Sequence, residues 1–340
     1  DDELESLAAI ARRLGAQVVE SSDPTKEILT QIRGKAVLYY GQSEGSYAWA
    51  CAKKLMLQDI VASRDYPIQF KHADILFNQL RLVKDESEIK LIRDAIAETH
   101  DVFSEVLPFV KSGATELALR DRFLQATVRR GREVSFKPIV GTGVSAAKPH
   151  YSAFKRSLKS SELLLVDYGL ECSQYAAYIT RVFPVSGKFS DVHREVYEIV
   201  LEAKKVATRK MKPGASFQLS QAACETVLIE GLKELGILRG KTSVLRAKGA
   251  HKQYTIHSAS HSLGLDVHDI SKDRFTLLDK LKTGMVLTIE PGLYFNSRTK
   301  HIPACGIRLE DDILISKAGS ENLSKQIPIE IEDVEAWMRQ

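Results

Sequence analysis

Residues 163–184 read LLLVDYGLECSQYAAYITRVFP, and they contain the first strong sign of a functional site. The apolar run LLLV is typical of a buried strand, and it leads directly to a single acid, Asp167. The polar letters ECSQ predict a turn, and Tyr175–Phe183 predicts the strand that returns beside the first one. The stretch therefore predicts a β-hairpin that carries one carboxylate into the interior.

The register of this hairpin decides which side chain faces the acid. A tip at Cys172–Ser173 would set Asp167 directly opposite Tyr178. Opposed side chains share one face with Cβ atoms about 5 Å apart, a spacing at which two carboxylates can hold a metal pair. Here one partner is a phenol. The function therefore depends on whether Tyr178 occupies a position that normally belongs to a carboxylate.

Composition places the chain among ordinary globular proteins. Its 340 residues suggest about two or three domains, and a hydrophobic content of 44% is enough for sizeable cores. The 48 basic and 44 acidic side chains leave a net charge of +4, which is too small to recruit nucleic acid or a membrane. We therefore expect neither as a partner.

The cysteines and the first residues indicate a cellular compartment. The cysteines lack CxxC spacing, so they predict neither a disulfide framework nor a zinc ribbon. No apolar run approaches the roughly 20 residues of a membrane span, and the acidic start DDELE is unlike a signal peptide. We expect a cytoplasmic protein. The four cysteines are Cys51, Cys172, Cys224 and Cys305.

Residues 1–82 alternate helical and strand patterns and predict a small α/β domain. Apolar spacing predicts a helix over Leu4–Leu14, a strand over Ala36–Tyr40, and a second helix over Tyr47–Leu57 that leads into a strand at Ile60–Val61. No glycine-rich phosphate loop follows these strands. We expect no chemistry in this domain.

From residue 83 the pattern changes to long helices and predicts a second domain over 83–340. Asp85, with Glu88 three residues later, forms the start of a capping box. KSGAT at 111–115 and KPGAS at 212–216 each separate two predicted helices, 101 residues apart. This suggests an internal duplication with a cleft between its halves, a common place for a site.

Acids and histidines of the second domain recur on apolar strands and at strand ends. Oxygen-rich ligation with one imidazole favours manganese, cobalt or zinc over copper or an iron–sulfur cluster. Two such ions could acidify a shared water and so support hydrolysis of an amide bond. The metal-competent groups are Asp167, His261, Glu290 and Glu310, with His257 and His268 in the same stretch as His261.

Five motifs in order carry a resemblance to a known family. They are VDYG at 166–169, ITRVFPVSGKFS at 179–190, SHSLGLDVHD at 260–269, LTIEPGLY at 287–294 and GIRLEDD at 306–312. With them the chain resembles the pita-bread metallopeptidases, and among these the Xaa-Pro peptidases, aminopeptidase P and prolidase. The resemblance implies an α+β pita-bread domain over 83–340, preceded by a shortened N-terminal α/β domain over 1–82.

The resemblance also implies roles for the metal-competent groups. Asp167 would be a metal ligand, and Glu310 would bridge two ions. His261 and Glu290 would bind the second ion, and Glu290 would also carry protons. The family holds two divalent ions, for which manganese is the first expectation and cobalt or zinc the alternatives.

Four further residues match positions around the family's substrate. His150, in PHYS, would contact substrate. His257 and His268 would line the pocket near the scissile bond. Arg308 would orient Glu310, because a ligand's orientation and basicity depend on the groups behind it.

The sequence departs from the family at Tyr178, where the family has a second aspartate that bridges both ions. A phenol with an ordinary pKa near 10 is neutral at pH 7 and offers one oxygen instead of two. Its ring could also fill the space of an ion. The departure predicts an impaired site with one ion or none.

Two functions therefore stay open. The first is hydrolysis of Xaa-Pro bonds at peptide N-termini, as an aminopeptidase or dipeptidase with an altered site. The alternative is a catalytically inactive pseudo-peptidase that binds a peptide or protein partner in the same cleft, and a purely structural subunit is a third reading. The expected partners are a peptide with proline at its second position and further copies of the chain in a homo-oligomer.

Overall fold

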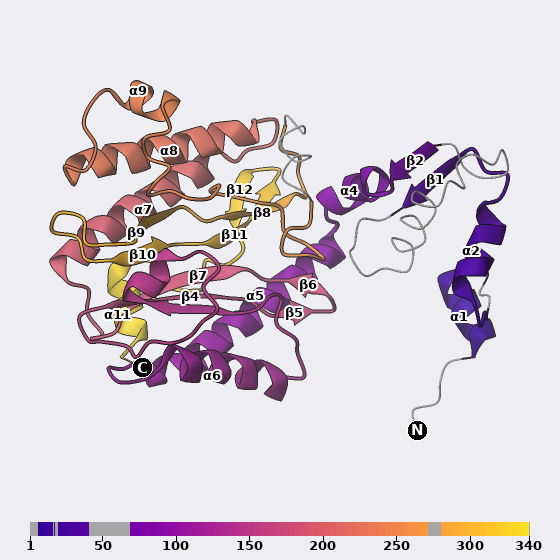
Figure 1. Cartoon of the computed structure of the whole chain (residues 1–340), viewed down its shortest axis with the longest axis horizontal. Coiled ribbons are helices and arrows are strands. Elements are labelled where there is room, and N and C mark those ends of the chain that lie inside the picture. The colour runs from indigo at the N-terminus through magenta and orange to yellow at the C-terminus, as the bar shows by residue number, and fades with distance from the viewer. Residues whose placement is uncertain (1–5, 16, 18–19, 41–68, 271–279, 340) are drawn as a thin grey trace. The chain divides into compact units, whose positions relative to one another are not determined.

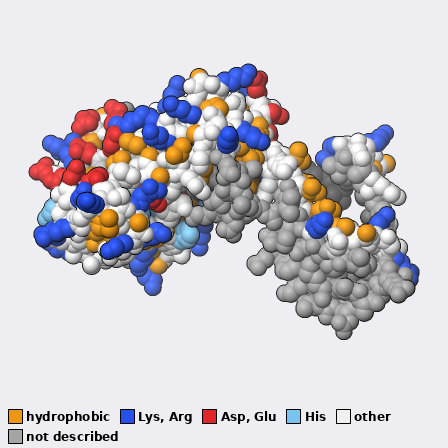
Figure 2. Space-filling view, turned by 90° about the horizontal axis from the view of Figure 1, so that it is seen from above, with side chains coloured by type: hydrophobic (Ala, Val, Ile, Leu, Met, Phe, Trp, Pro, Cys, Tyr) orange, Lys and Arg blue, Asp and Glu red, His pale blue; other side chains and the backbone are white. Residues whose placement is uncertain are grey.

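A computed structural model describes residues 6–15, 17, 20–40, 69–270 and 280–339 (Figure 1). The chain divides into two compact units, Asp1–Asn78 and Gln79–Gln340. Within the described ranges, no helix combines the length and apolarity needed to cross a membrane. Lysines, arginines and acids are interspersed on the face of the larger unit seen in Figure 2.

The smaller unit contains helices and a pair of parallel strands, so its α/β character agrees with the sequence pattern. The predicted first helix and first strand are confirmed as α1 and β1. The predicted elements at 47–57 and 60–61 lie outside the described residues. The elements are α1 Leu7–Leu14, α2 Pro24–Ile32, β1 Val37–Tyr40, β2 Gln69–His72 and α4 Asp74–Leu82, whose last turn lies in the larger unit.

Two pairs of long helices cover the strands of the larger unit (Figure 1). Helix α5 packs on α6, and α7 packs on α8. The predicted capping box is confirmed, because Asp85 Oδ1 accepts from Glu88 N at 2.9 Å while Glu88 Oε2 accepts from Asp85 N at 2.8 Å. The helices are α5 Glu86–Val106, α6 Glu116–Arg129, α7 Asp191–Lys210, α8 Phe217–Glu234, α9 Thr242–Ala247 and α11 Ile331–Trp337, with 3-10 turns at Leu107–Phe109 and Gly143–Ala147.

The strands described in the larger unit are all antiparallel and fall into two three-stranded sheets and two two-stranded ladders. One sheet has the order β3-β4-β7 and the other β12-β11-β8, while β9 pairs with β10 and β5 with β6. The strands are β3 Ile139–Thr142, β4 Leu163–Tyr168, β5 Glu171–Cys172, β6 Tyr175–Ala176, β7 Ile179–Pro184, β8 Val286–Ile289, β9 Gly292–Phe295, β10 Cys305–Arg308, β11 Asp311–Ser316 and β12 Gly319–Asn322.

The predicted hairpin exists, but the register predicted for it is wrong. The turn is centred on Ser173–Gln174, whose φ angles of 48° and 69° suit a two-residue turn with left-handed backbone. The pairing Cys172↔Tyr175 carries this centre down the hairpin, so Asp167 faces Thr180 instead of Tyr178. Moving the tip by one residue shifted the pairing by two. Tyr178 falls between β6 and β7, outside the paired residues, and its backbone N donates to Asp312 Oδ2 at 3.1 Å.

The two repeated loops make the same contacts. Gly113 N donates to Leu158 O at 3.0 Å and Leu158 N donates to Ala114 O at 2.8 Å. In the second loop Gly214 N donates to Leu281 O, and Leu281 N donates to Ala215 O, both at 2.8 Å. Both glycines have left-handed φ, 90° and 80°. The matching hydrogen-bond patterns of the two loops support the internal duplication suggested by KSGAT and KPGAS.

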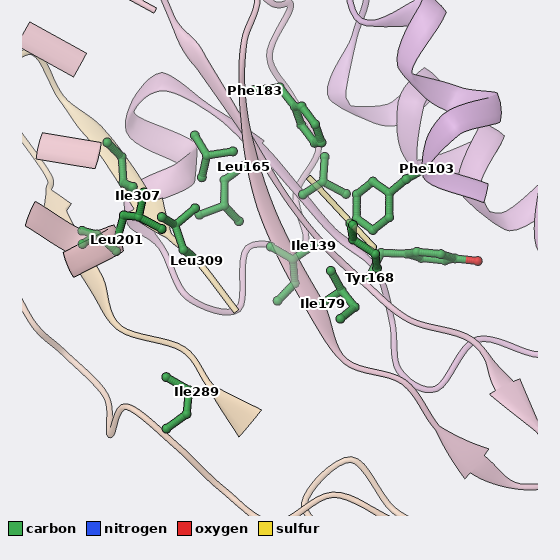
Figure 3. Close-up of a cluster of buried hydrophobic side chains, with 14 of the residues drawn as sticks. Phe103, Ile139, Leu165, Tyr168, Ile179, Phe183, Leu201, Ile289, Ile307 and Leu309 are labelled. Atoms are coloured by element: carbon green, nitrogen blue, oxygen red, sulfur yellow. The ribbon is translucent and has the colours of Figure 1, made fainter. Parts of the chain in front are cut away.

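The core runs continuously from one half to the other. Figure 3 shows apolar side chains from α5, β4 and β7 together with others from α7 and β10. Phe103 of α5 lies with its ring centroid 5.8 Å from that of Tyr168 and 6.1 Å from that of Phe183. The halves therefore share one hydrophobic interior.

A buried guanidinium fastens the two sheets to each other. Arg181 of β7 is fully buried and donates to the carboxylate of Asp311 at 2.7 Å and to the backbone carbonyls of Glu310 and Ile327. Lys204 of α7 also binds Asp311. Burial alone would raise the pKa of Asp311, but the charges of Lys204 and Arg181 outweigh it and hold the pKa well below its usual range.

We expect Arg181→Met to lower the free energy of unfolding by roughly 3–5 kcal/mol, because it leaves a buried carboxylate and several carbonyls short of a donor. Urea denaturation followed by circular dichroism measures the loss. Arg209→Met is the control, since Arg209 and Glu202 form an exposed pair, 62% and 52% accessible, worth about 1 kcal/mol at most. Equal losses in both variants would contradict this account of the junction.

Candidate metal centre

Strand ends from both halves deliver acids to one place. Asp167 lies on β4 of the first sheet, and Tyr178 directly precedes β7. Glu290 directly follows β8, and Glu310 lies between Arg308, the last residue of β10, and β11. Glu310 N donates to Thr180 O at 3.2 Å, which brings the two groups of strand ends together.

His261 reaches the same place from an irregular segment that runs beside β8. Glu290 N donates to Ala259 O at 2.8 Å, Thr288 N to His261 O at 2.9 Å, and Leu263 N to Val286 O at 3.0 Å. These bonds repeat like those of a strand pair, so the segment holds a fixed register against β8. The imidazole of His261 is thereby placed beside Glu290.

Three side chains have the geometry of a metal-binding group. The ligand atoms of His261, Glu290 and Glu310 all lie within 4.8 Å of one another. His261 Nε2 is 3.5 Å from Glu290 Oε1 and 4.0 Å from Glu310 Oε1. Nitrogen and oxygen ligands bind zinc-like ions at about 2.0–2.2 Å, which sets ligand atoms roughly 3.4 Å apart around a tetrahedral ion. The spacing therefore fits one ion.

The electrostatics of these groups also fit a cation. Among the described residues, His261 Nε2, Glu310 Oε1 and Asp167 Oδ1 are buried without a hydrogen-bond partner. Burial raises the pKa of Glu310, and the charges of Glu290 and Asp167 add to the increase. Burial likewise raises the pKa of Asp167. A divalent ion would reverse this cost, because it favours the ionised form of each acid.

The tautomer of His261 leaves the correct nitrogen available. His261 Nδ1 lies 3.1 Å from the carbonyl oxygen of Ser262, which can only accept, so Nδ1 carries the proton. Burial, with the neighbouring His268, lowers the pKa of His261 to about 3, so the ring is neutral. The lone pair of Nε2 therefore faces Glu290 and Glu310, as metal ligation requires.

A hydrogen-bond network behind the acids joins the two halves and includes two residues that sequence reasoning missed. Arg308 donates to Asp167 Oδ2, to Thr180 Oγ1 at 3.0 Å and to Tyr294 OH at 3.0 Å. Thr180 Oγ1 then donates to Glu310 Oε2 at 2.6 Å, so Arg308 acts on Glu310 through Thr180. The two missed residues are Thr180, in the motif at 179–190, and Tyr294, in the motif at 287–294. Their place in these motifs, on strands close to the predicted ligands, could have indicated them.

The same network fixes His257. Its Nδ1 lies 2.8 Å from the carbonyl oxygen of Ser258 and its Nε2 lies 2.6 Å from Tyr294 OH. Since the carbonyl can only accept, Nδ1 donates and Nε2 accepts from the tyrosine. His257 Nδ1 is also 3.4 Å from Glu290 Oε2. His257 is therefore connected to the acids on both sides of its ring.

Tyr178 lies within this site as a half-buried ring. Its ring centroid is 4.1 Å from that of Phe136 and 5.1 Å from that of His261, and it stacks on His268 with an interplanar angle of 22°. Burial raises the pKa of Tyr178 well above its usual value, and the charges of Asp167 and Glu310 raise it further. Without a bound cation, Tyr178 is a neutral phenol.

The site opens into a cavity of about 550 Å³. The exposed side chains of His150 and His268 form part of its wall. Glu310 is fully buried behind the wall of the cavity, next to His261 and Glu290. The structure thus brings all nine sequence-predicted site residues together: the lining includes His150, Asp167, Tyr178, His257, His261, His268, Glu290 and Arg308, with Glu310 behind them.

Solved structures similar to this chain share its architecture. Zinc-substituted Escherichia coli aminopeptidase P in complex with product is 31% identical with a TM-score of 0.86, and the match covers 99% of this chain and 78% of that one. Escherichia coli aminopeptidase P with the inhibitor Pro-Leu is 32% identical with a TM-score of 0.85, over 97% and 77% of the two chains. The likeness therefore includes both units.

Sequence relatives and a family profile agree with this likeness. The Xaa-Pro aminopeptidase of Escherichia coli is 33% identical over 97% of this chain and 77% of its own length, and that of Haemophilus influenzae is 35% identical over 77% and 62%. The chain thus spans less than two thirds of the second relative. The profile of metallopeptidase family M24 matches residues 90–317. The chain therefore belongs to metallopeptidase family M24, in its Xaa-Pro aminopeptidase group, and has the pita-bread fold of that family.

Proposed function

We propose that the chain is a metal-dependent peptidase that cleaves the bond between an N-terminal residue and a following proline. One observation carries the proposal. His261 Nε2, Glu310 Oε1 and Asp167 Oδ1 are buried and find no hydrogen-bond partner in the described part of the chain. His261 and Asp167 line one cavity together with Glu290, and Glu310 lies within 4.8 Å of His261 and Glu290. Such groups are stable together only if a cation or a proton neutralises them.

A single divalent ion fits the donor set. His261, Glu290 and Glu310 would hold it. Asp167 is outside this group of three but lines the same cavity, with Oδ1 free of hydrogen bonds. One imidazole with carboxylates suits manganese, cobalt or zinc. When bound, the ion would polarise the scissile carbonyl and acidify a water molecule.

The remaining steps belong to residues of the chain. Glu290 would accept the proton of the attacking water and pass it to the departing proline nitrogen, since its carboxylate lies at the cavity wall. His257, held by Ser258 and Tyr294, would orient Glu290 from 3.4 Å. His150 and His268 would contact the peptide. The Pro-Leu dipeptide in the Escherichia coli structure supports a proline-containing ligand here.

Tyr178 supports a second candidate function. We place it at the position of the family's second aspartate, and its ring lies against His261 and His268 in the space beside Asp167. If that ring prevents ion binding or the approach of water, the chain would bind peptides in the cavity without cleaving them. Cleavage is preferred, because Arg308, Thr180 and Tyr294 still hold Asp167, Glu310 and His257 in place.

Cleavage is tested with Glu290→Gln. We expect the native chain with manganese, cobalt or zinc to release the first residue from an Xaa-Pro-Yaa peptide, and a chelator to abolish release. The variant should lower kcat by at least about 100-fold, because it loses the proton carrier. Chromatography of the products measures both. Glu195→Gln, on the exposed side of α7, should keep the native rate. A native rate in Glu290→Gln would refute the assigned role.

The role of Tyr178 is tested with Tyr178→Asp and, as the matched control, Tyr178→Phe. Native protein and the Phe variant should each hold one ion, because a neutral phenol contributes a ring and no ligand. The Asp variant should hold two ions and raise kcat/KM at least tenfold, about 1.4 kcal/mol of barrier. Elemental analysis and the peptide assay measure these changes.

Each other outcome has a defined meaning. Two tightly held ions in the native protein, lost in Tyr178→Phe, would show that the phenolate is a ligand. Reduced activity in Tyr178→Asp would show that the tyrosine takes part in the reaction. No cleavage by any of the three proteins, with a proline peptide still bound, would favour the binding function.

A further inference from the structure

Lys84 forms a buried ion pair beneath the segment that carries two of the site histidines. It lies between α4 and α5, and its Nζ is 2.9 Å from Asp269 Oδ2, with both side chains about 1% accessible. Lys84 is itself held in place, because its backbone N donates to Gly284 O at 2.8 Å. A charge pair so completely removed from water is costly to build unless its geometry is fixed.

The backbone of the histidine segment is packed directly onto this pair. A Cβ on Gly264 would lie 2.5 Å from Asp269 Oδ2 and 2.9 Å from Lys84 Cε. Contacts that short would force Asp269 or Lys84 to move if position 264 carried a side chain. Gly264 therefore allows the backbone of the segment to lie directly against the ion pair.

The pair is connected to His261 through one carbonyl group. Asp269 N donates to Ser262 O at 3.2 Å, and the same oxygen accepts from Nδ1 of His261 at 3.1 Å. Ile270 N donates to Ser262 Oγ at 2.8 Å and closes the segment at the same residue. Ser262 O thus fixes both the tautomer and the orientation of His261, and Asp269 fixes Ser262.

We infer that Lys84 is a positioning residue for the metal-binding imidazole, acting through Asp269 and the Ser262 carbonyl. Lys84 precedes the first helix of the pita-bread domain and lies 177 residues before His261 in the sequence. The inference rests on the metal-binding part of the proposed function. It adds that the junction before α5 holds the ring of His261 in its ligating orientation.

The test uses Lys84→Met, Lys84→Arg and the control Lys90→Met in the whole chain. Lys90 forms an ion pair with Asp94 on α5 that is exposed, 73% and 45% accessible. Loss of a partner behind a metal ligand lowers metal affinity about 10–100-fold, so we expect that loss of zinc affinity in Lys84→Met. Lys84→Arg should recover most of it, and Lys90→Met should bind like the native chain.

A second readout is independent of metal and of catalysis. In metal-free protein, the amides of Asp269 and Ile270 should exchange with deuterium at least tenfold faster in Lys84→Met than in the native chain, because both donate to Ser262. A merely stabilising role would lower the melting temperature, speed exchange of the protected amides throughout the larger unit to the same extent, and leave the zinc affinity at its native value. That result would overturn the inference.

The design separates this inference from the proposed function. A native chain that binds zinc without cleaving peptide would refute the peptidase proposal, and the zinc comparison would still decide the role of Lys84. If the native chain binds no zinc, the exchange of the two amides decides it. If Lys84→Met does not fold, Asp269→Asn takes its place in both measurements. Asparagine has nearly the shape of aspartate without its charge, and we expect the same losses.

Discussion

Burial of charge at the boundary between two similar halves is the constraint on which this structure depends. Asp167, Glu310 and Asp311 are almost completely inaccessible to water. Ions in that setting cost several kcal/mol each unless they are paired. Arg181 and Arg308 meet this demand across the boundary, because each extends from one half to acceptors in the other. The planar guanidinium group allows several directed bonds at once, so the alignment of the halves is set by these two side chains.

The arginines do not pair with every buried carboxylate oxygen, and the oxygens left without a partner define the site. Arg181 and Lys204 satisfy Asp311, whereas Arg308 satisfies only one oxygen of Asp167 and reaches Glu310 through Thr180. The unsatisfied oxygens collect where His261 offers a lone pair. Burial and the charges of Asp167 and Glu310 raise the pKa of Tyr178, so the phenol stays neutral and does not compensate these acids. The candidate metal site thus consists of the acidic oxygens that the structural ion pairs do not satisfy.

Elements that depend on residues close together in the sequence could be predicted from it. Contacts between residues far apart in the sequence could not. The helix start at Asp85 follows from capping chemistry and is observed. The acids and histidines of the motifs lie at one cavity, and three of them, His261, Glu290 and Glu310, are close enough together to hold an ion. The position predicted for the hairpin turn was wrong by one residue. The left-handed residues of the turn, Ser173 and Gln174, are not glycines, so the sequence did not mark them. Thr180, Tyr294 and Lys84 were missed because their partners become neighbours only in the folded chain.

The bond between Arg308 and Asp167 joins residues 141 positions apart. During synthesis the acid leaves the ribosome long before its partner, and Glu310 appears only two residues after Arg308. Folding that waits for contacts so distant in sequence is slow. While those 141 residues are being made, Asp167 has no guanidinium partner and must stay exposed to water or protonated. Translation speed between the two halves, and chaperones that shield the first of them, would then determine how much of the protein reaches its folded state.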